Sequence, residues 1–317
     1  AVEYPRFRMN DDREVSCYAL MLDHQAGKDV HDEALATWLA QKDADDGCAL
    51  MAATLVDAKK FSNADLWRKV RVAIDAGRPK AARQAAVLIG AWPAASVVEL
   101  SDSPLRFLAK SASASTRPGA ELAALSLMRL ASTDPDAAVL QLNERWDRAL
   151  PPDLAAWAWA AVGKQAALKL MPEATEHFQR AALRASREGA EPDWPDDTLA
   201  WKVRAALRAD GGRGRWQQVM QGINAMSAEQ QRDPAWVYWK ARALQKLSGN
   251  SQDAEGMRGL SRELLASIAG RMHFYGKLAA EDLDRSLALP AAPAPLSAAE
   301  REAASAHPGL SRALQLM

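Results

Sequence analysis

The residues best suited to acid–base chemistry in this sequence are carboxylates, and they occur in three short clusters. The clusters are Asp11–Asp12, Asp43–Asp46 and Glu191–Asp197. General acid–base catalysis needs a carboxyl group or a histidine held in a pocket. Each cluster lies where a helix is predicted to begin, and carboxylates there accept backbone N–H bonds and suit the helix dipole. We therefore interpret the clusters as helix caps in preference to a catalytic carboxylate pair.

Two other patterns could bind a metal ion or a phosphate group. His24 and His31, with the acidic residues beside them, could form a metal site, but a predicted helix break at Gly27 separates them. The glycine-rich stretch 210–215 follows a predicted helix rather than a strand, and it lacks the Gly-Lys-Ser/Thr ending of a phosphate loop. The sequence therefore predicts no catalytic, cofactor-binding or metal-binding residue.

The charge balance and composition exclude several classes of partner. Lys plus Arg and Asp plus Glu both number 40, so the chain has no excess positive charge to attract nucleic acid. No apolar run is long enough for a membrane-spanning helix. The 11 Trp residues could stack on sugar rings or bases, but at helical spacing they are more often core residues. We expect no more than about three of them to be exposed.

The stretch 233–283 shows the helical pattern most clearly. Asp233 and Pro234 are typical of a helix start. Trp236 and Trp239 open an apolar stripe on this helix, and a return helix is predicted over 254–269. A third helix begins after His273. Such a helix pair cannot bury its own apolar stripe, so it must stack on neighbouring pairs.

Nearly every other segment also predicts a helix, and helix pairs recur along the chain. Trp159, Trp201 and Trp239 are each in the first helix of a pair, at intervals typical of helical repeats. We predict an all-α fold, an irregular tetratricopeptide-like superhelix or solenoid of stacked helix pairs. Its expected parts are a scaffold domain over 1–288, a Pro/Ala linker over 289–296 and the start of a further helical region over 297–317.

Two segments resemble the soluble lytic murein transglycosylases, a family of peptidoglycan enzymes. The first is Trp236–Leu244 (WVYWKARAL), and the second is His273–Leu283 (HFYGKLAAEDL). Trp236, Trp239, Phe274, Tyr275 and Glu281 are the signature positions. The resemblance implies a helical region that forms a ring in the family, a location in the periplasm and contact with glycan strands and other cell-wall enzymes.

The family cleaves the bond between N-acetylmuramic acid and N-acetylglucosamine without water and leaves a 1,6-anhydro end. Its catalytic Glu lies in an E-S motif, accompanied by G-L-M-Q and A-Y-N-A-G motifs, and none of these occurs here. No catalytic residue can therefore be transferred to this chain. We expect the catalytic domain to lie beyond Met317 and an export signal to precede Ala1. The alternative is a non-catalytic tetratricopeptide-like adaptor that binds a protein or peptide.

Cys17 and Cys48 are the two cysteines of the chain. Their composition and apolar contexts leave two alternatives open, a disulfide bond or two buried thiols. The family resemblance implies the disulfide, because these positions fall where the family has one in its helical region.

We predict that neither thiol of the purified, unreduced chain reacts with an alkylating reagent under denaturing conditions. Mass spectrometry of the alkylated chain, before and after reduction, measures this. Two alkylated cysteines before reduction would contradict the disulfide.

Overall fold

The computed structural model describes residues 12–186, 193–249, 252–286, 292 and 294–315. Every secondary-structure element of these residues is a helix. The chain divides into two compact units, residues 1–264 and residues 265–317, and each is considered by itself. The predicted domain boundary at residue 288 stays a prediction. Within the described residues, no helix is both long enough and apolar enough to cross a membrane.

The first half of the chain contains helices that are 7 to 17 residues long. They are α2 (Arg13–Gln25), α3 (His31–Ala40), α4 (Asp46–Asp57), α5 (Asn63–Asp75), α6 (Pro79–Ile89), α7 (Ala91–Asp102), α8 (Pro104–Lys110), α9 (Arg117–Thr133) and α10 (Pro135–Gln141). A π-helical turn, Leu142–Trp146, and the short α11 (Asp147–Ala149) follow.

The second half continues the same pattern of helices and short turns. Its elements are α12 (Pro152–Leu168), α13 (Ala174–Ala185), α14 (Asp196–Gly212), α15 (Trp216–Asn224), a 3₁₀ turn (Gln230–Arg232), α16 (Pro234–Ser248), α17 (Ala254–Ala269), α18 (Phe274–Asp282), α19 (Ala298–Ala306) and α20 (Pro308–Gln315).

The predicted helix starts agree with the observed caps. The carboxylates of Asp12, Asp45 and Asp233 each accept a backbone N–H bond from the first turn of the following helix. Ser62 and Ser297 each complete a capping box, in which the serine and an acidic residue three positions later bond each other's backbone. These local signals fix where the helices begin.

Two segments differ from the sequence interpretation. The sequence predicts a less regular segment over 91–104, with breaks at Trp92-Pro93 and Ser103-Pro104. The second break separates α7 from α8. At the first, α7 is a regular helix, because Pro93 lies in its first turn, where no N–H is needed. The sequence predicts one helix over 136–150, but the structure has a π-helical turn at 142–146 within this segment. A π-helical turn contains one more residue than an α-helical turn. The residue types of this segment do not indicate where such a turn occurs.

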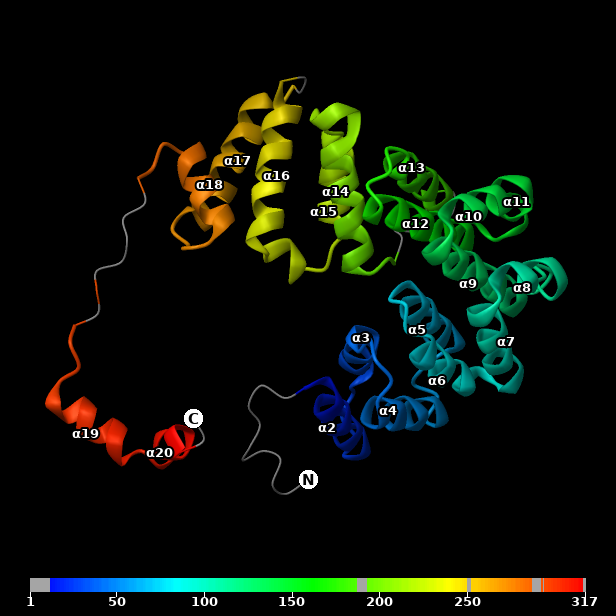
Figure 1. Cartoon of the computed structure of the whole chain (residues 1–317), viewed down its shortest axis with the longest axis horizontal. Helices are drawn as coiled ribbons and strands as arrows, with labels where there is room; N and C mark the ends of the chain where they lie inside the picture. The colour runs from blue at the N-terminus through cyan, green and yellow to red at the C-terminus, as the bar shows by residue number, and fades with distance from the viewer. Residues whose placement is uncertain (1–11, 187–192, 250–251, 287–291, 293, 316–317) are drawn as a thin grey trace. The chain divides into compact units, whose positions relative to one another are not determined.

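Helices of the first unit pack mainly on their neighbours in the chain. The pairs α5–α6, α12–α13 and α14–α15 are in contact, and α6–α7, α12–α14 and α15–α16 connect one pair to the next. Figure 1 shows these helices following one another in chain order from α2 to α16. The apolar stripe of each pair is thus buried by the next pair.

The pair α12–α13 shows how tightly such helices pack. Phe178 is 1% exposed and lies against Gly163, where a Cβ atom would come within 3.0 Å of the phenyl ring. Ala174 and Ala181, beside Phe178 on α13, are buried as well. Small residues packed beside an aromatic ring are typical of a tetratricopeptide-like helix pair.

A disulfide bond connects the first helices. Cys17 on α2 and Cys48 on α4 are bonded and buried, as the family resemblance implies. The bond closes a loop with a sequence separation of 31. In the chain-entropy model, a loop of this length stabilises a fold by about 3–4 kcal/mol.

The second unit contains the end of α17 and the helices α18, α19 and α20. His273 caps α18 by accepting a bond from the backbone N–H of Gly276 through its Nδ1 atom. The described residues of α19 and α20 are exposed throughout.

Candidate functional site

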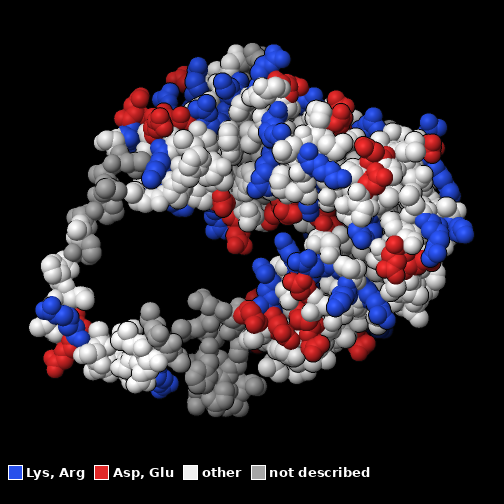
Figure 2. All heavy atoms as spheres, in the orientation of Figure 1, with Lys and Arg blue, Asp and Glu red and all other residues white. Residues whose placement is uncertain are grey.

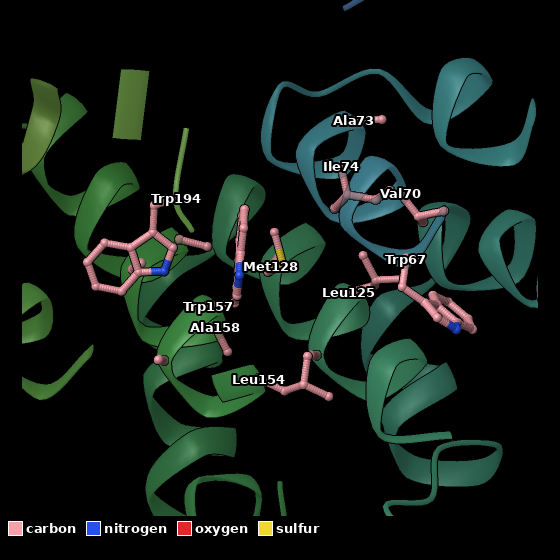
Figure 3. Close-up of a cluster of buried hydrophobic side chains, with 14 of the residues drawn as sticks. Trp67, Val70, Ala73, Ile74, Leu125, Met128, Leu154, Trp157, Ala158 and Trp194 are labelled. Carbon is pink, nitrogen blue, oxygen red and sulfur yellow. The ribbon is translucent and has the colours of Figure 1, made fainter. Parts of the chain in front are cut away.

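The most elaborate arrangement of side chains lies where α5, α9, α12 and residues 193–198 meet, which we call the central joint. Figure 3 shows its apolar side chains. The buried residues contributed by these elements include Trp67, Val70, Ile74, Leu125, Met128, Leu154, Trp157 and Trp194. The joint therefore brings together segments that are far apart in the sequence.

A guanidinium–carboxylate group forms one part of the central joint. Arg71 on α5 donates from Nη1 to both oxygens of Glu121 on α9, each at 2.7 Å, and both side chains are buried. The Arg71 guanidinium also lies over the ring of Trp157, 5.4 Å from its centroid. Arg117 completes the group by pairing with Glu121 and Asp153. The hydrogen bond from Arg117 to Asp153 is the main cause that raises the pKa of Arg117.

A buried lysine forms the second part. Lys164 on α12 lies 2.8 Å from Asp75 at the end of α5 and 2.7 Å from Asp197 at the start of α14. Thr198 donates a hydrogen bond to the same Asp75 carboxylate at 2.9 Å. Burial alone would lower the pKa of Lys164, but the two carboxylates outweigh this effect and its pKa is raised. The lysine therefore stays charged and connects α12 to both α5 and α14.

Asp193 forms the third part, just before α14. Its carboxylate accepts a hydrogen bond from Nε1 of Trp157 at 2.8 Å and pairs with Arg68 at 3.1 Å. The sequence interpretation treated the acidic residues of 191–197 as helix caps. Asp193 and Asp197 instead form ion pairs with α5 and α12, and Glu191 lies outside the described residues.

Lys69, on the opposite side of α5, is another buried lysine. It is 3% exposed, and its Nζ atom donates to the backbone oxygens of Trp38 and Gln41 at the end of α3. Burial lowers the pKa of Lys69 to about 8, although the nearby Asp45 opposes this. Lys69 thus satisfies the terminal carbonyls of α3, at the cost of a desolvated charge.

A smaller polar cluster surrounds the π-helical turn. Asp147, directly after the turn, accepts a hydrogen bond from Trp159 Nε1 at 2.8 Å and pairs with Arg184 on α13. The ring of His177 stacks on Trp159 with a centroid distance of 5.7 Å. Burial, together with the charge of Arg180, lowers the pKa of His177. The cluster fixes α13 against the turn.

The other patterns considered for chemistry remain separate from these groups. Within the residues that the structure describes, no group of three or more His, Cys, Asp or Glu side chains could hold a metal ion. In the glycine-rich stretch, Asp210, Gly211, Gly212 and Gly214 have positive φ angles, so the chain reverses there, and Arg215 pairs with Asp210. This stretch is a turn, as expected.

The tryptophans are mostly buried. Among all 11, which lie in the described residues, only Trp92 is in the exposed class, at 57%, and Trp201, Trp216 and Trp239 are half-buried. Figure 2 shows Lys and Arg interspersed with Asp and Glu on the visible face, in place of one extended patch of a single sign. Both observations agree with the expectation from composition.

The signature residues occupy two helices. Trp236 is buried and Trp239 half-buried on α16. Phe274 begins α18 and is 67% exposed, Tyr275 contacts it edge-on at 5.2 Å, and Glu281 is exposed near the end of that helix. Their role as family-signature positions stays a prediction.

These groups can position helices, because their buried charges have partners on other elements. Sequence reasoning missed the central joint, because key partners are far apart in the chain. Arg71 and Glu121 are 50 positions apart, Lys164 and Asp75 are 89, and Thr198 and Asp75 are 123. The only available signal was the presence of charged residues on the apolar faces of α5 and α12.

Comparison with known proteins identifies the fold. No protein-family model and no curated protein sequence matches the chain. Among solved structures, an inactive mutant of lytic transglycosylase Slt from Pseudomonas aeruginosa is similar, with a TM-score of 0.51 and 21% identity. The fold is shared with this Slt. The match covers 99% of the present chain and 50% of the Slt chain. It confirms the predicted all-α superhelical fold class.

A second similar structure is a 70-kDa soluble lytic transglycosylase in complex with bulgecin A. Its TM-score is 0.47 and its identity 20%, over 97% of this chain and 47% of that chain. The chain therefore spans about half the length of both solved transglycosylases.

Replacing Lys164 with Met should lower the free energy of unfolding by about 3–5 kcal/mol, because it leaves the buried Asp75 carboxylate without its cation. Lys28→Met is the control, since the Lys28–Asp23 pair is exposed, at 64% and 43% of the two side chains, and should contribute at most about 1 kcal/mol. Urea denaturation measures both variants. Equal losses in the two variants would contradict the structural role of the joint.

Lys69 should make stability rise with pH in the alkaline range. Its folded pKa is about 8, below the ordinary value of 10.5, so the unfolded chain binds more protons between these two values. The contribution of Lys69 to the free energy of unfolding is therefore constant below pH 8 and rises by about 3 kcal/mol up to pH 10.5.

Urea denaturation of the unsubstituted chain and of Lys69→Met at pH 7 and pH 10 tests this rise. The stability difference between the two proteins should change with pH in favour of the unsubstituted chain. A difference that is the same at both values would show that Lys69 is not desolvated in the fold.

Proposed function

We propose that this chain is the helical scaffold region of a soluble lytic transglycosylase and that it contacts peptidoglycan in the periplasm. The observation that carries the proposal is the match of 99% of the chain to the fold of lytic transglycosylase Slt. The segments 236–244 and 273–283 add a resemblance in sequence to the same family. This agreement favours the transglycosylase scaffold over the tetratricopeptide-like adaptor.

The disulfide bond supports the proposed location. Structural disulfides persist in oxidising compartments such as the periplasm and are rare in the cytosol. The buried bond between Cys17 and Cys48 connects α2 to α4 within the core of the first unit. An export signal upstream of Ala1 belongs to this proposal.

The scaffold role follows from what the side chains do. Five carboxylates that connect helices in the central joint, namely Asp75, Glu121, Asp153, Asp193 and Asp197, are each paired with a cation. A general acid for glycan cleavage must reach the glycosidic oxygen, whereas these carboxylates bind cations on neighbouring helices. The cleavage that yields 1,6-anhydro ends is therefore assigned to the part of the enzyme outside this chain.

The purified chain should sediment with isolated peptidoglycan sacculi and release no 1,6-anhydromuropeptides. Pelleting assays measure binding, and mass spectrometry of the supernatant measures release. An unrelated soluble protein of similar mass serves as the control for trapping in the pellet. Absence of binding would contradict the proposed contact with peptidoglycan, and anhydro products would contradict the assignment of catalysis to another region.

A further inference from the structure

Arg204 on α14 is held between two indole rings. Its guanidinium carbon lies 4.8 Å from the ring centroid of Trp201 and 5.3 Å from that of Trp236 on α16. Both distances are within the range of cation–π attraction. Arg204 itself is exposed, whereas Trp236 is buried and Trp201 half-buried. The side chain is therefore held against two indole rings while part of the residue remains exposed to solvent.

Two more cations extend this surface along the same helices. Arg208 lies one turn after Arg204 on α14 and is exposed, and Lys240 lies one turn after Trp236 on α16 and is half-buried. The helices α14 and α16 both pack on α15, to which turns connect them, so they run in the same direction. We call Trp201, Arg204, Arg208, Trp236 and Lys240 the α14–α16 face.

The cations of this face have no carboxylate partner. In the part of the chain that the structure describes, no Asp or Glu pairs with Arg204, Arg208 or Lys240. Figure 2 shows Lys and Arg side chains, with Asp and Glu among them, over the region that α14 and α16 occupy in Figure 1. In a chain with equal numbers of acidic and basic residues, three neighbouring cations without partners form a local excess of positive charge.

A second arginine of this protein that lies on an indole ring is paired with a carboxylate. Arg71 also lies over an indole, that of Trp157, and it donates to both oxygens of Glu121. Arg204 lies on two indole rings, whereas Arg71 lies on one. Unlike Arg71, Arg204 has no carboxylate partner in the described part of the chain. A planar guanidinium fixed by stacking loses little freedom when a carboxylate binds its edge. The α14–α16 face therefore fits a ligand that presents a carboxylate.

We propose that the α14–α16 face binds free carboxylates on the peptide side chains of peptidoglycan. This inference rests on the proposed function, which supplies the polymer. Arg204 binds one carboxylate through its N–H edge, Arg208 and Lys240 attract neighbouring carboxylates, and the exposed part of Trp201 lies beside the polymer. The scaffold thereby recognises the peptide side chains rather than the neutral sugar rings.

Sedimentation with sacculi tests this site through Arg204→Gln, which removes the charge and the fork of N–H donors. We expect its apparent affinity to fall about tenfold, because a bidentate arginine–carboxylate pair is lost. Arg204→Lys should restore little of the binding, since an ammonium group cannot bind in the same bidentate way. Arg83→Gln removes one exposed charge from α6 and should bind like the unsubstituted chain.

Sacculi whose carboxylates have been converted to amides provide the chemical control. On them the unsubstituted chain should bind at least as weakly as Arg204→Gln binds to untreated sacculi. The double variant Arg208→Gln/Lys240→Gln touches neither indole contact of Arg204, so it tests the charge of the face should Arg204→Gln fail to fold. It should also bind more weakly than Arg83→Gln.

The outcomes separate the two proposals. If the unsubstituted chain binds sacculi and the Arg204 and double variants bind equally well, the carboxylate site is wrong and the proposed function stands. Undiminished binding to amidated sacculi would overturn the site in the same way. If the unsubstituted chain does not bind sacculi at all, both proposals fail.

Discussion

The ion pair between Lys164 and Asp75 is the interaction on which the arrangement of the first unit depends. Most helix contacts join elements one or two places apart in the chain, but this pair joins residues 89 positions apart. Buried ions are costly unless each is fully paired, and here Asp197 and Thr198 complete the group. These short contacts can form together in only one position of α5 relative to α12 and α14. Burial of the apolar side chains stabilises the contact between these helices, and the ion pairs determine their relative position along their axes.

Local structure could be predicted from the sequence where the determining residues are adjacent. Asp12, Ser62 and Asp233 indicated helix starts because a cap bonds the backbone two or three positions away. The π-helical turn after Gln141 could not be predicted, since it is a matter of packing rather than of residue type. The pairing of Lys164 with Asp75 was equally inaccessible. Periodicity shows which face of a helix is buried but not which distant residue lies opposite.

The protein uses one chemical unit, an arginine lying on tryptophan, for two different purposes. At Arg71 the guanidinium also pairs with Glu121, and the buried group holds helices together in the interior. At Arg204 it is open at the surface. A fold alone does not determine function, and the similarity to lytic transglycosylase Slt at 21% identity concerns the fold. The groups that distinguish scaffold from binding surface are therefore found among individual side chains rather than in the architecture.

The central joint also imposes an order on biosynthesis. A chain made from its amino terminus produces α5 long before α12 and α14, so the carboxylate of Asp75 must stay hydrated until Lys164 and Thr198 have been synthesised. The disulfide partners, only 31 positions apart, meet much earlier. The disulfide therefore joins α2 and α4 over a short loop, whereas the central joint needs contacts between residues much farther apart. Until α12 has been synthesised, Trp67 and Ile74 on α5 lack the part of the apolar cluster that α12 contributes in the finished fold.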